Sequence, residues 1–241
     1  MKFALVTSST RGVGKAIGIK LLDMGYYVFF NYCNNDKTAT NLENELSIRF
    51  NGLFKIIKSD LSLIEGVENL CNHITTVTQT LDCIVLNTGI TCYDNFEDIT
   101  LSNWNKVIST NVTMPFFIVQ GLDKLLLDNS RVIFIGSRMG ELAHGRSIPY
   151  AVSKASLHML SKSLVKVYAK RNITVNTIAI GFVDTEWHNN KDENHINRIK
   201  GKIALNRLGD TEEIAILCEH LINNNYINGC TINIDGGYDM I

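Results

Sequence analysis

The fold is decided by residues 2–14, which read KFALVTSSTRGVG. An apolar, strand-like run (2–7) passes directly into a turn with glycines at positions 12 and 14, and a helical pattern continues to about Met24. Glycines in such a turn let the backbone come close to a pyrophosphate, and the first turn of the helix offers it free N–H groups. A lone Gly-x-Gly is weak evidence, but its place after the first strand of an alternating chain predicts a dinucleotide-binding turn.

Short β-rich runs alternate with longer helical patterns along the rest of the chain. The runs expected to form strands are 2–7, 27–32, 53–58, 83–86, 131–135, 174–179 and 231–234. Near-continuous apolar strands that alternate with helices are typical of a parallel sheet covered on both faces. We therefore predict an α/β fold, a doubly wound (Rossmann) parallel sheet of about seven strands that forms a single domain over residues 1–241.

Composition narrows the classes of function. The chain has 241 residues, of which 45% are hydrophobic, so it can bury a sizeable core. Its net charge of −1 gives no electrostatic reason to expect nucleic acid or an anionic membrane as a partner. The six cysteines and six histidines show no Cys-x-x-Cys or His-x-x-x-His spacing, so no metal site is predicted. Because the sequence has neither a signal-like N-terminus nor an apolar run of about 18 residues, we expect a cytoplasmic protein.

A tyrosine–lysine pair stands at the start of a helical pattern that runs through Ala169. Tyr150 and Lys154 are four residues apart, about one α-helical turn, so both side chains lie on one face. An ammonium near a phenol favours the phenolate, and we expect Lys154 to lower the pKa of Tyr150 from its reference of about 10. Alone, the pair is compatible with an ordinary surface contact. Beside a cofactor it predicts a proton donor and acceptor that works near neutral pH.

The type of dinucleotide is predicted from the end of the second strand. An acid there would bond the ribose diol of NAD and repel a 2′-phosphate. The chain has Asn31-Tyr32-Cys33-Asn34 at this point, with no carboxylate until Asp36, while Arg11 in the phosphate turn can pair with an additional phosphate. These features favour NADPH over NAD. Asp60, just past the third strand, suits an adenine amino group, and Asn87-Thr88-Gly89 would wall the adenosine side.

Together these motifs resemble the short-chain dehydrogenase/reductase family over essentially the whole chain. The matching motifs, in the family's order, are the turn at 7–14, Asp60-Leu61, Asn87-Thr88-Gly89, Asn111, Ser137, Tyr150…Lys154, Asn176…Gly181 and Gly229…Asp235-Gly236-Gly237. Each is modest alone, whereas their ordered co-occurrence is specific. The resemblance implies a nicotinamide-dependent oxidoreductase that acts on a carbonyl or an alcohol.

The resemblance implies a role for each of four residues. Tyr150 would be the general acid/base at the substrate oxygen, and Lys154 would lower its pKa and bond the nicotinamide ribose. Ser137 would orient that oxygen and stabilise charge on it, and Asn111 would hold a water linking Lys154 to solvent. A plain strand-end role for Ser137 and a helix-internal role for Asn111 are the alternatives. The implied cofactor-binding residues are Ser8, Ser9, Thr10, Arg11, Gly12, Val13, Gly14, Cys33, Asp60, Leu61, Asn87, Thr88, Gly89, Tyr150, Lys154, Val183 and Thr185.

Four positions depart from the family pattern. Ser8 stands where the family has a glycine, so we expect either added bulk in the turn or a backbone angle that glycine adopts more readily. Leu86 and Thr88 replace an asparagine and an alanine, which removes a hydrogen bond within the sheet. Ile180 replaces a proline before Gly181. None of these changes touches the residues expected to carry the chemical step.

Within the family the strongest likeness is to the 3-oxoacyl-[acyl-carrier-protein] reductases, on Asn31-Tyr32, residues 206–209 and the ending 232–237. Those enzymes dock an acidic carrier protein with arginines, and here Arg171 matches one such position whereas Asp128 takes the other. A 3-oxoacyl thioester, on an acyl-carrier protein or not, is therefore one substrate class. A free small ketone, a sugar or a quinone is the alternative.

Further expectations concern activity, the segment 185–205 and assembly. A non-catalytic dinucleotide-binding sensor is an alternative function, motivated by Ser8, and an isomerase of nucleotide sugars would need a larger substrate domain. The polar segment 185–205 follows a strand end, and it is either a substrate lid or an exposed insertion. The resemblance also implies a homotetramer, with the helices around 103–127 and 150–169 packing across one interface.

Overall fold

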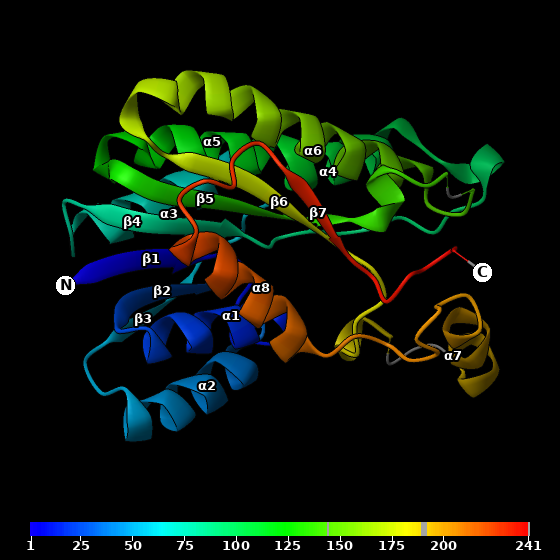
Figure 1. Cartoon of the computed structure of the whole chain (residues 1–241), viewed down its shortest axis with the longest axis horizontal. Helices are drawn as coiled ribbons and strands as arrows, with labels where there is room; N and C mark the ends of the chain where they lie inside the picture. The colour runs from blue at the N-terminus through cyan, green and yellow to red at the C-terminus, as the bar shows by residue number, and fades with distance from the viewer. Residues whose placement is uncertain (144, 189–191, 241) are drawn as a thin grey trace.

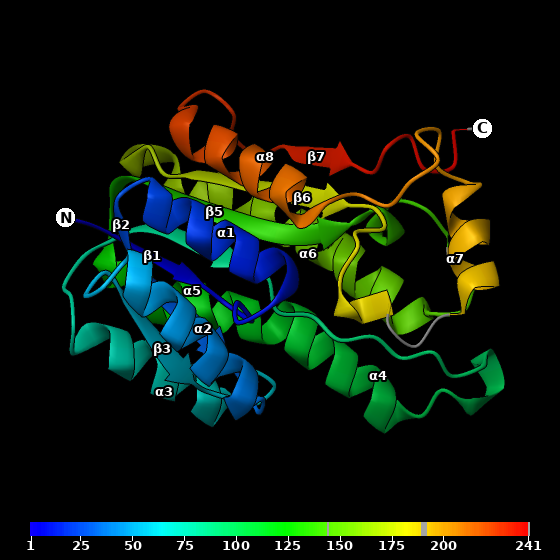
Figure 2. The same ribbon diagram turned by 90° about the horizontal axis from the view of Figure 1, so that it is seen from below.

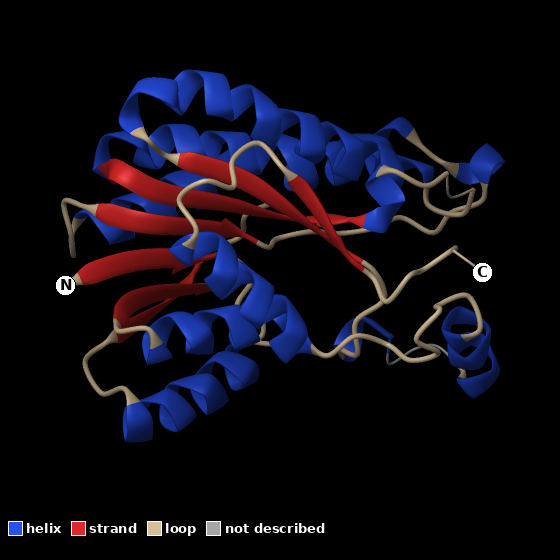
Figure 3. Cartoon of the chain, viewed as in Figure 1, coloured by secondary structure: helices blue, strands red, loops and turns tan. Residues whose placement is uncertain are grey.

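Seven parallel strands form the centre of the structure, a computed structural model that describes residues 1–143, 145–188 and 192–240 (Figures 1 and 3). The strands are β1 (Lys2–Val6), β2 (Tyr26–Tyr32), β3 (Phe54–Lys58), β4 (Leu81–Leu86), β5 (Leu126–Ser137), β6 (Thr174–Ile180) and β7 (Thr231–Ile234). Their order in the sheet is β3-β2-β1-β4-β5-β6-β7. The predicted doubly wound sheet is confirmed.

Helices cover both faces of this sheet. The helices are α1 (Gly12–Asp23), α2 (Asp36–Arg49), α3 (Ile64–Thr75), α4 (Leu101–Ile108), α5 (Met114–Leu122), α6 (Ile148–Tyr168), α7 (Glu193–Lys200) and α8 (Thr211–Asn223). Helices α1, α2 and α8 lie on one face, and α3, α4, α5 and α6 on the other (Figures 1 and 2). Helix α7 stands apart from both layers, beyond the carboxyl ends of the strands.

Each strand contributes to two separate cores because alternate side chains point to opposite faces. In β2, Phe29 packs in the core beneath α3, α5 and α6, whereas Val28 and Phe30 pack in the core beneath α1, α2 and α8. All three side chains have 0% exposure. Burial on both faces explains why the strands read as continuous apolar runs rather than as alternating patterns.

The region between β4 and β6 differs most from the expected boundaries. Strand β5 begins at Leu126, five residues earlier than its apolar run, because Leu126 pairs with Leu81 before the register shifts. Two helices are present here, as expected, and a π-helical segment, Ser109–Thr113, joins them. Pro115 follows it and has no N–H to give the carbonyl of Asn111, so the α-helical ladder is interrupted at this point.

Within the described part of the chain, no helix has the length and apolar character needed to cross a membrane.

Candidate active site

A cleft of about 1330 Å³ opens at the carboxyl edge of the sheet. The predicted site residues that line it are Ser8, Arg11, Gly12, Val13, Asn87, Gly89, Ser137, Tyr150, Lys154, Val183 and Thr185. Those that do not line it are Ser9, Thr10, Gly14, Cys33, Asp60, Leu61, Thr88 and Asn111. Across the described residues, no group of three or more His, Cys, Asp or Glu side chains is arranged to hold a metal ion.

The phosphate turn presents free backbone donors to the cleft. Helix α1 begins after Arg11, whose side chain makes no capping hydrogen bond, so the first N–H groups of the helix keep their donor capacity. Gly12 has φ of +53°, and a Cβ built on it would lie 3.4 Å from the Cγ2 atom of Thr185. The turn and the loop that follows β6 therefore face one another across the site of the predicted pyrophosphate.

Gly14 is required for close packing within the turn, and it does not line the open cleft. A Cβ at this position would lie 2.5 Å from the carbonyl oxygen of Ser8 and 2.7 Å from the Nδ2 atom of Asn87. Ser9 and Thr10 are buried as well, and the Ser9 hydroxyl donates to the carbonyl oxygen of Val6 at 2.7 Å. These three predicted residues shape the turn from behind.

Asn31, at the end of β2, holds the phosphate turn and was not among the predicted site residues. It is 1% exposed, and its Oδ1 atom accepts from the backbone N–H of Ser8 at 3.1 Å. Its Nδ2 atom donates to the carbonyl oxygen of Ser59 at 3.1 Å. The signal available in the sequence was an amide side chain inside an apolar strand, where a buried polar group must find partners.

The predicted adenosine side lies only partly in the main cleft, because Asn87 and Gly89 line it whereas Cys33, Asp60, Leu61 and Thr88 do not. Cys33 and Asp60 are exposed, and the Oδ1 atom of Asp60 accepts hydrogen bonds from the N–H and the hydroxyl of Ser62 at 2.9 and 2.7 Å. Leu61 is 3% exposed and belongs to the core, so only its backbone can reach a cofactor. Asp36 forms an ion pair with Lys58 at 2.8 Å, and this lysine holds the pKa of the carboxyl below its usual value.

Tyr150 and Lys154 lie on one face of α6, which starts at Ile148 with Pro149 in its first turn. The Lys154 ammonium is 5.6 Å from the centre of the Tyr150 ring and donates to the carbonyl oxygen of Ile135 at 2.8 Å. Burial lowers the pKa of Lys154 to about 8. The contact between the two side chains is therefore real, but the ammonium bonds the end of β5 and not the phenol.

The expected direction of the Tyr150 pKa was wrong for the protein without cofactor. Burial raises the pKa of Tyr150 to about 12, and a hydrogen bond with Ser137 offsets only part of this rise. The spacing of the pair predicted closeness correctly, but it carried no information on the low-dielectric surroundings that disfavour the phenolate.

Asn111 sits in the π-helical segment and is completely buried. Its Oδ1 atom accepts from the N–H of Ile90 at 2.8 Å, and its Nδ2 atom donates to the carbonyl oxygen of Ile90 and to the Ser153 hydroxyl, each at 2.9 Å. A Cβ built on Gly89 would lie 3.4 Å from the Lys154 ammonium and 3.8 Å from Asn111 Oδ1. The asparagine thus joins the loop after β4 to α6 beside Lys154.

Comparisons with known proteins agree with this arrangement. Residues 7–239 match the family model described as enoyl-(acyl carrier protein) reductase. The chain belongs to the short-chain dehydrogenase/reductase family. It is 31% identical to the 3-oxoacyl-[acyl-carrier-protein] reductase FabG of Aquifex aeolicus, over 98% of this chain and 96% of the relative. It is 32% identical to the acetoacetyl-CoA reductase of Rhizobium meliloti, over 98% of each chain.

A solved structure of another protein also matches this chain over nearly its whole length. The structure described as the Pseudomonas aeruginosa RhlG/NADP active-site complex matches with a TM-score of 0.90 at 33% identity, over 99% of this chain and 96% of that chain. As a member of the short-chain dehydrogenase/reductase family, the protein is an NAD(P)-dependent oxidoreductase.

Two of the departures from the family pattern compensate one another. Ser8 has φ of +48°, the left-handed conformation that glycine adopts more readily, so the expected backbone strain is present. Its hydroxyl lies 2.8 Å from the hydroxyl of Thr88, which is also a departure from the family pattern. The Thr88 N–H donates to the Oγ1 atom of Thr7 at 3.1 Å. Leu86 is 2% exposed and packs in the core. The side chains that this chain adds therefore hold the strained turn in place.

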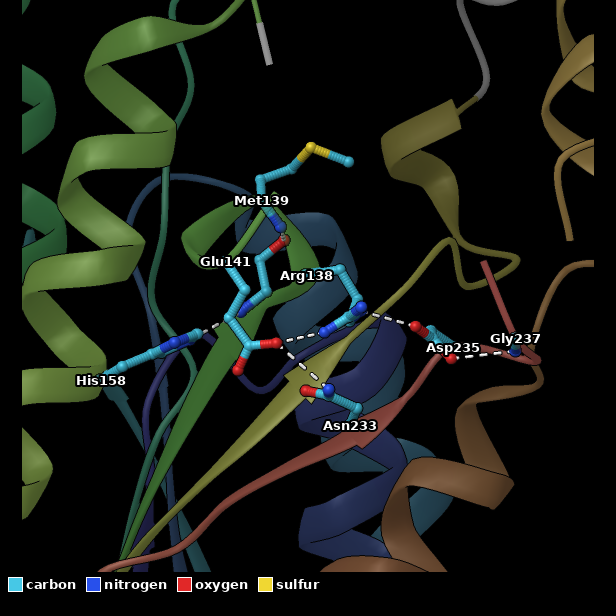
Figure 4. A network of polar contacts seen from close by, with 8 residues as sticks. Arg138, Met139, Glu141, His158, Asn233, Asp235 and Gly237 are labelled. Atoms are coloured by element: carbon cyan, nitrogen blue, oxygen red, sulfur yellow. Dashed lines mark hydrogen bonds and ion pairs between the residues drawn. The ribbon is translucent and has the colours of Figure 1, made fainter. Parts of the chain in front are cut away.

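The turn after Ser137 is fixed by a network of charges that the sequence did not suggest (Figure 4). Ser137 ends β5, and its Oγ atom accepts from the N–H of Met139 at 3.2 Å. The guanidinium of Arg138, which is 5% exposed, forms ion pairs with Glu141 and, at 2.6 Å, with Asp235. The available signal was an arginine directly after an apolar strand, where a buried charge requires partners.

The segment 185–205 forms part of the cleft wall. It contains a short 3-10 helix (Glu186–His188) and α7, while residues 189–191 lie outside the described part of the chain. The Trp187 ring centre is 6.4 Å from that of Tyr150, and 48% of the indole is exposed. At its far end, the N–H of Leu205 donates to the carbonyl oxygen of Gly236 at 3.1 Å. The segment is therefore held at its base by the C-terminal turn.

Replacing the buried ammonium is expected to stabilise the protein. Because the pKa of Lys154 is lowered from 10.5 to about 8, keeping the buried side chain charged below pH 8 destabilises the folded protein by about 3 kcal/mol. A variant without this charge also loses the hydrogen bond with Ile135, which offsets about 1–2 kcal/mol of the gain. Lys154→Met should raise the free energy of unfolding at pH 7 by about 1–2 kcal/mol, measured by denaturant titration.

The sign of this effect also depends on pH. Above pH 8 the lysine is deprotonated in the native protein, while in the unfolded chain it stays charged up to about pH 10.5. The wild-type protein therefore gains stability across this window, and the difference in free energy of unfolding between Lys154→Met and the wild-type protein should shrink. Lys162→Met, on the exposed side of the same helix, is the control. A Lys154→Met protein that is no more stable than wild type at pH 7 would contradict the assignment.

Proposed function

We propose that the protein reduces the carbonyl group of a small substrate to an alcohol with NADPH, and that Tyr150 is the general acid. The observation that carries this proposal is the convergence of Ser137, Tyr150 and Lys154 in one cleft beside the phosphate turn. A hydroxyl, a phenol and an ammonium that line one cleft are the groups needed to protonate an oxygen and to stabilise the charge on it.

The described residues fit a dinucleotide. The uncapped N-terminus of α1 suits the pyrophosphate, and Gly12 and Gly89 leave room for close approach because neither carries a Cβ. Val183 and Thr185 would hold the nicotinamide carboxamide and the phosphates, while Asp60 would hold the adenine. Bound in this way, the nicotinamide supplies the hydride to the carbonyl carbon.

The protein's own part in the reaction is the handling of one proton. The Tyr150 hydroxyl transfers its proton to the carbonyl oxygen as the oxygen gains charge, and the Ser137 hydroxyl donates a hydrogen bond to the same oxygen. The Lys154 ammonium favours the tyrosinate that remains. Because Pro115 gives no N–H to the carbonyl of Asn111, that carbonyl can accept from a water on the proton's return path to Tyr150.

The NADPH preference is supported by the charges around the adenosine side. Asp36, the first carboxylate after β2, is paired with Lys58 and accepts from the Tyr32 hydroxyl at 2.9 Å. Arg11 lines the cleft at the phosphate turn, and none of the described residues forms an ion pair with it. An unpaired guanidinium in the phosphate turn, together with a neutralised acid after β2, favours the 2′-phosphate of NADPH.

Arg11→Ala should therefore weaken NADPH selectively. We expect the KM for NADPH to rise about tenfold or more, which corresponds to the roughly 1.5–3 kcal/mol of a charge-assisted hydrogen bond, while the KM for NADH changes little. Steady-state kinetics with both cofactors measure the two values. Arg49→Ala, which removes a surface arginine paired with Asp23, is the control. Equal use of NADH by the wild-type protein would refute the preference.

The cleft walls support an extended acyl substrate, such as a 3-oxoacyl thioester. Aromatic side chains from several elements line the cleft: Tyr93, Phe96, Phe182, Trp187 and Tyr238. The relatives include a 3-oxoacyl-[acyl-carrier-protein] reductase and an acetoacetyl-CoA reductase. A free small ketone, a sugar or a quinone remains the alternative substrate class, and a cofactor sensor without turnover the alternative function.

The contacts of Arg171 bear on whether the acyl thioester is carried by coenzyme A or by an acyl-carrier protein. Its guanidinium forms ion pairs with Asp123 at 3.0 Å and with Asp128 at 3.4 Å, and it also donates to the carbonyl oxygen of Leu126. An arginine already paired with two carboxylates has little charge to offer an acidic carrier protein. This favours a thioester of coenzyme A, or another small acyl thioester, over one carried on a protein.

Tyr150→Phe is the central test. Removal of the phenolic hydroxyl should lower kcat for NADPH-dependent reduction by at least about a hundredfold, while the dissociation constant for NADPH, measured by fluorescence titration, stays within about threefold. Acetoacetyl-CoA, acyl-carrier-protein thioesters, small ketones and quinones form the substrate panel. NADPH binding without turnover on any of them would favour the sensor, and substantial turnover by Tyr150→Phe would refute the role of the tyrosine.

Assembly and location also remain proposals. We propose a homotetramer in the cytoplasm, supported by exposed apolar side chains on the outer surfaces of the helices around 103–127 and 150–169. Val152 and Met159 on α6 are 40% and 62% exposed, and Leu101 at the start of α4 is 75% exposed. Apolar side chains concentrated on one helical layer are typical of a surface that pairs with another subunit.

A further inference from the structure

Helix α6 presents a third side chain to the catalytic end of β5, one turn beyond Lys154. Tyr150, Lys154 and His158 are spaced by four residues and lie on the same face of the helix. Lys154 donates to the carbonyl oxygen of Ile135, and the Nε2 atom of His158 accepts from the backbone N–H of Ser137 at 3.4 Å. Two residues of one helix thus bind the backbone on both sides of Gly136.

The space for the imidazole comes from two glycines that flank Ser137. A Cβ built on Gly136 would lie 2.4 Å from His158 Nε2, and one built on Gly140 would lie 2.7 Å from His158 Cε1. Both distances are shorter than side-chain carbons tolerate, so the ring fills the room that the missing side chains leave. The turn that carries the Ser137 hydroxyl is therefore packed against this histidine.

The charge state of His158 agrees with its role as an acceptor. The side chain is 6% exposed, and burial lowers its pKa to about 4, so the ring is neutral at neutral pH. Of the charged groups around it, Glu141 raises the pKa while Lys154, Lys162 and Arg138 lower it. Since Nε2 accepts a hydrogen bond from the N–H of Ser137, Nε2 carries no proton, and the proton of the neutral ring is on Nδ1.

We propose that His158 is a positioning residue for the reduction, which holds the Ser137 turn so that the Ser137 hydroxyl faces Tyr150. Ser137 is 6% exposed, and without an acceptor its N–H would be buried and unpaired. The turn would then move to find another partner, and the Oγ atom, already held from the other side by the N–H of Met139, would lose its direction. This proposal rests on the proposed function, because it assumes that Ser137 orients the substrate oxygen.

A matched pair of variants separates positioning from packing. Gln and Met are similar in length and volume to one another, but His158→Gln keeps an oxygen acceptor near the position of Nε2 and His158→Met does not. We expect His158→Met to lower kcat by about tenfold or more, as a lost buried acceptor predicts, with the KM for NADPH unchanged. His158→Gln should retain kcat within about threefold. Equal kcat losses in the two variants, or none in His158→Met, would overturn the proposal.

A measurement on the wild-type protein covers the case in which both variants fail to fold. Long-range nitrogen–proton NMR of the histidine rings reports which ring nitrogen carries the proton, and we expect His158 to be protonated at Nδ1 and bare at Nε2 at pH 7. A proton on Nε2 would overturn the proposal directly. The wild-type protein also keeps the two hypotheses apart, because absence of turnover on every carbonyl refutes the proposed function, whereas the NMR result bears on His158 alone.

Discussion

The buried ammonium of Lys154 is the group on which the rest of the site depends. It is 3% exposed, and its hydrogen bond goes to a single backbone carbonyl, that of Ile135, so much of the desolvation of the charge is uncompensated. A folded chain tolerates such a group only where surrounding packing stabilises the native state by more. The two apolar cores on either face of the sheet provide that stability, and the core beneath α3, α5 and α6 includes Leu157, Leu164 and Tyr168 of the helix that carries the lysine. This unfavourable burial is localised at the cleft, which Lys154 lines.

The same end of the sheet is assembled from polar side chains that bind the backbone of distant loops. Asn31 holds the phosphate turn from β2, Asn87 donates to the carbonyl oxygen of Ser8, and Asn111 clamps Ile90. Parallel strands bring their carboxyl ends to one edge, where each strand passes into a loop whose backbone groups have lost their sheet partners. Amide side chains can donate and accept at once, which suits them to this edge. These side chains hold the floor of the cleft together, and residues of the segment 185–205 line part of its wall.

The sequence could predict the strands and motifs that depend on local patterns, but little that depends on strand pairing, on contacts between distant residues or on burial. The strands were found because both faces are buried, except the first residues of β5, where the polar run Asp128-Asn129-Ser130 hid the pairing of Leu126 with Leu81. The motifs pointed to Ser137 and Lys154, which line the cleft with Tyr150, but not to Trp187, whose ring lies beside that of Tyr150. By contrast, the Ser8–Thr88 contact joins positions 80 residues apart. The direction of the Tyr150 pKa was missed for a related reason, since helical spacing gives distance but not burial.

Arg138 connects the turn after Ser137 to the base of the segment 185–205. Its partner Asp235 accepts from the N–H of Gly237 at 2.9 Å, and the carbonyl oxygens of Gly236 and Gly237 accept from the residues that end the segment 185–205. A Cβ on Gly181 would lie 2.7 Å from the Cα atom of Asp235, so the end of β6 is packed into the same joint. A buried ion pair contributes little net stability, but it has one favourable geometry. Because Arg138 is bonded covalently to Ser137, this joint connects the base of the segment 185–205 to the end of β5.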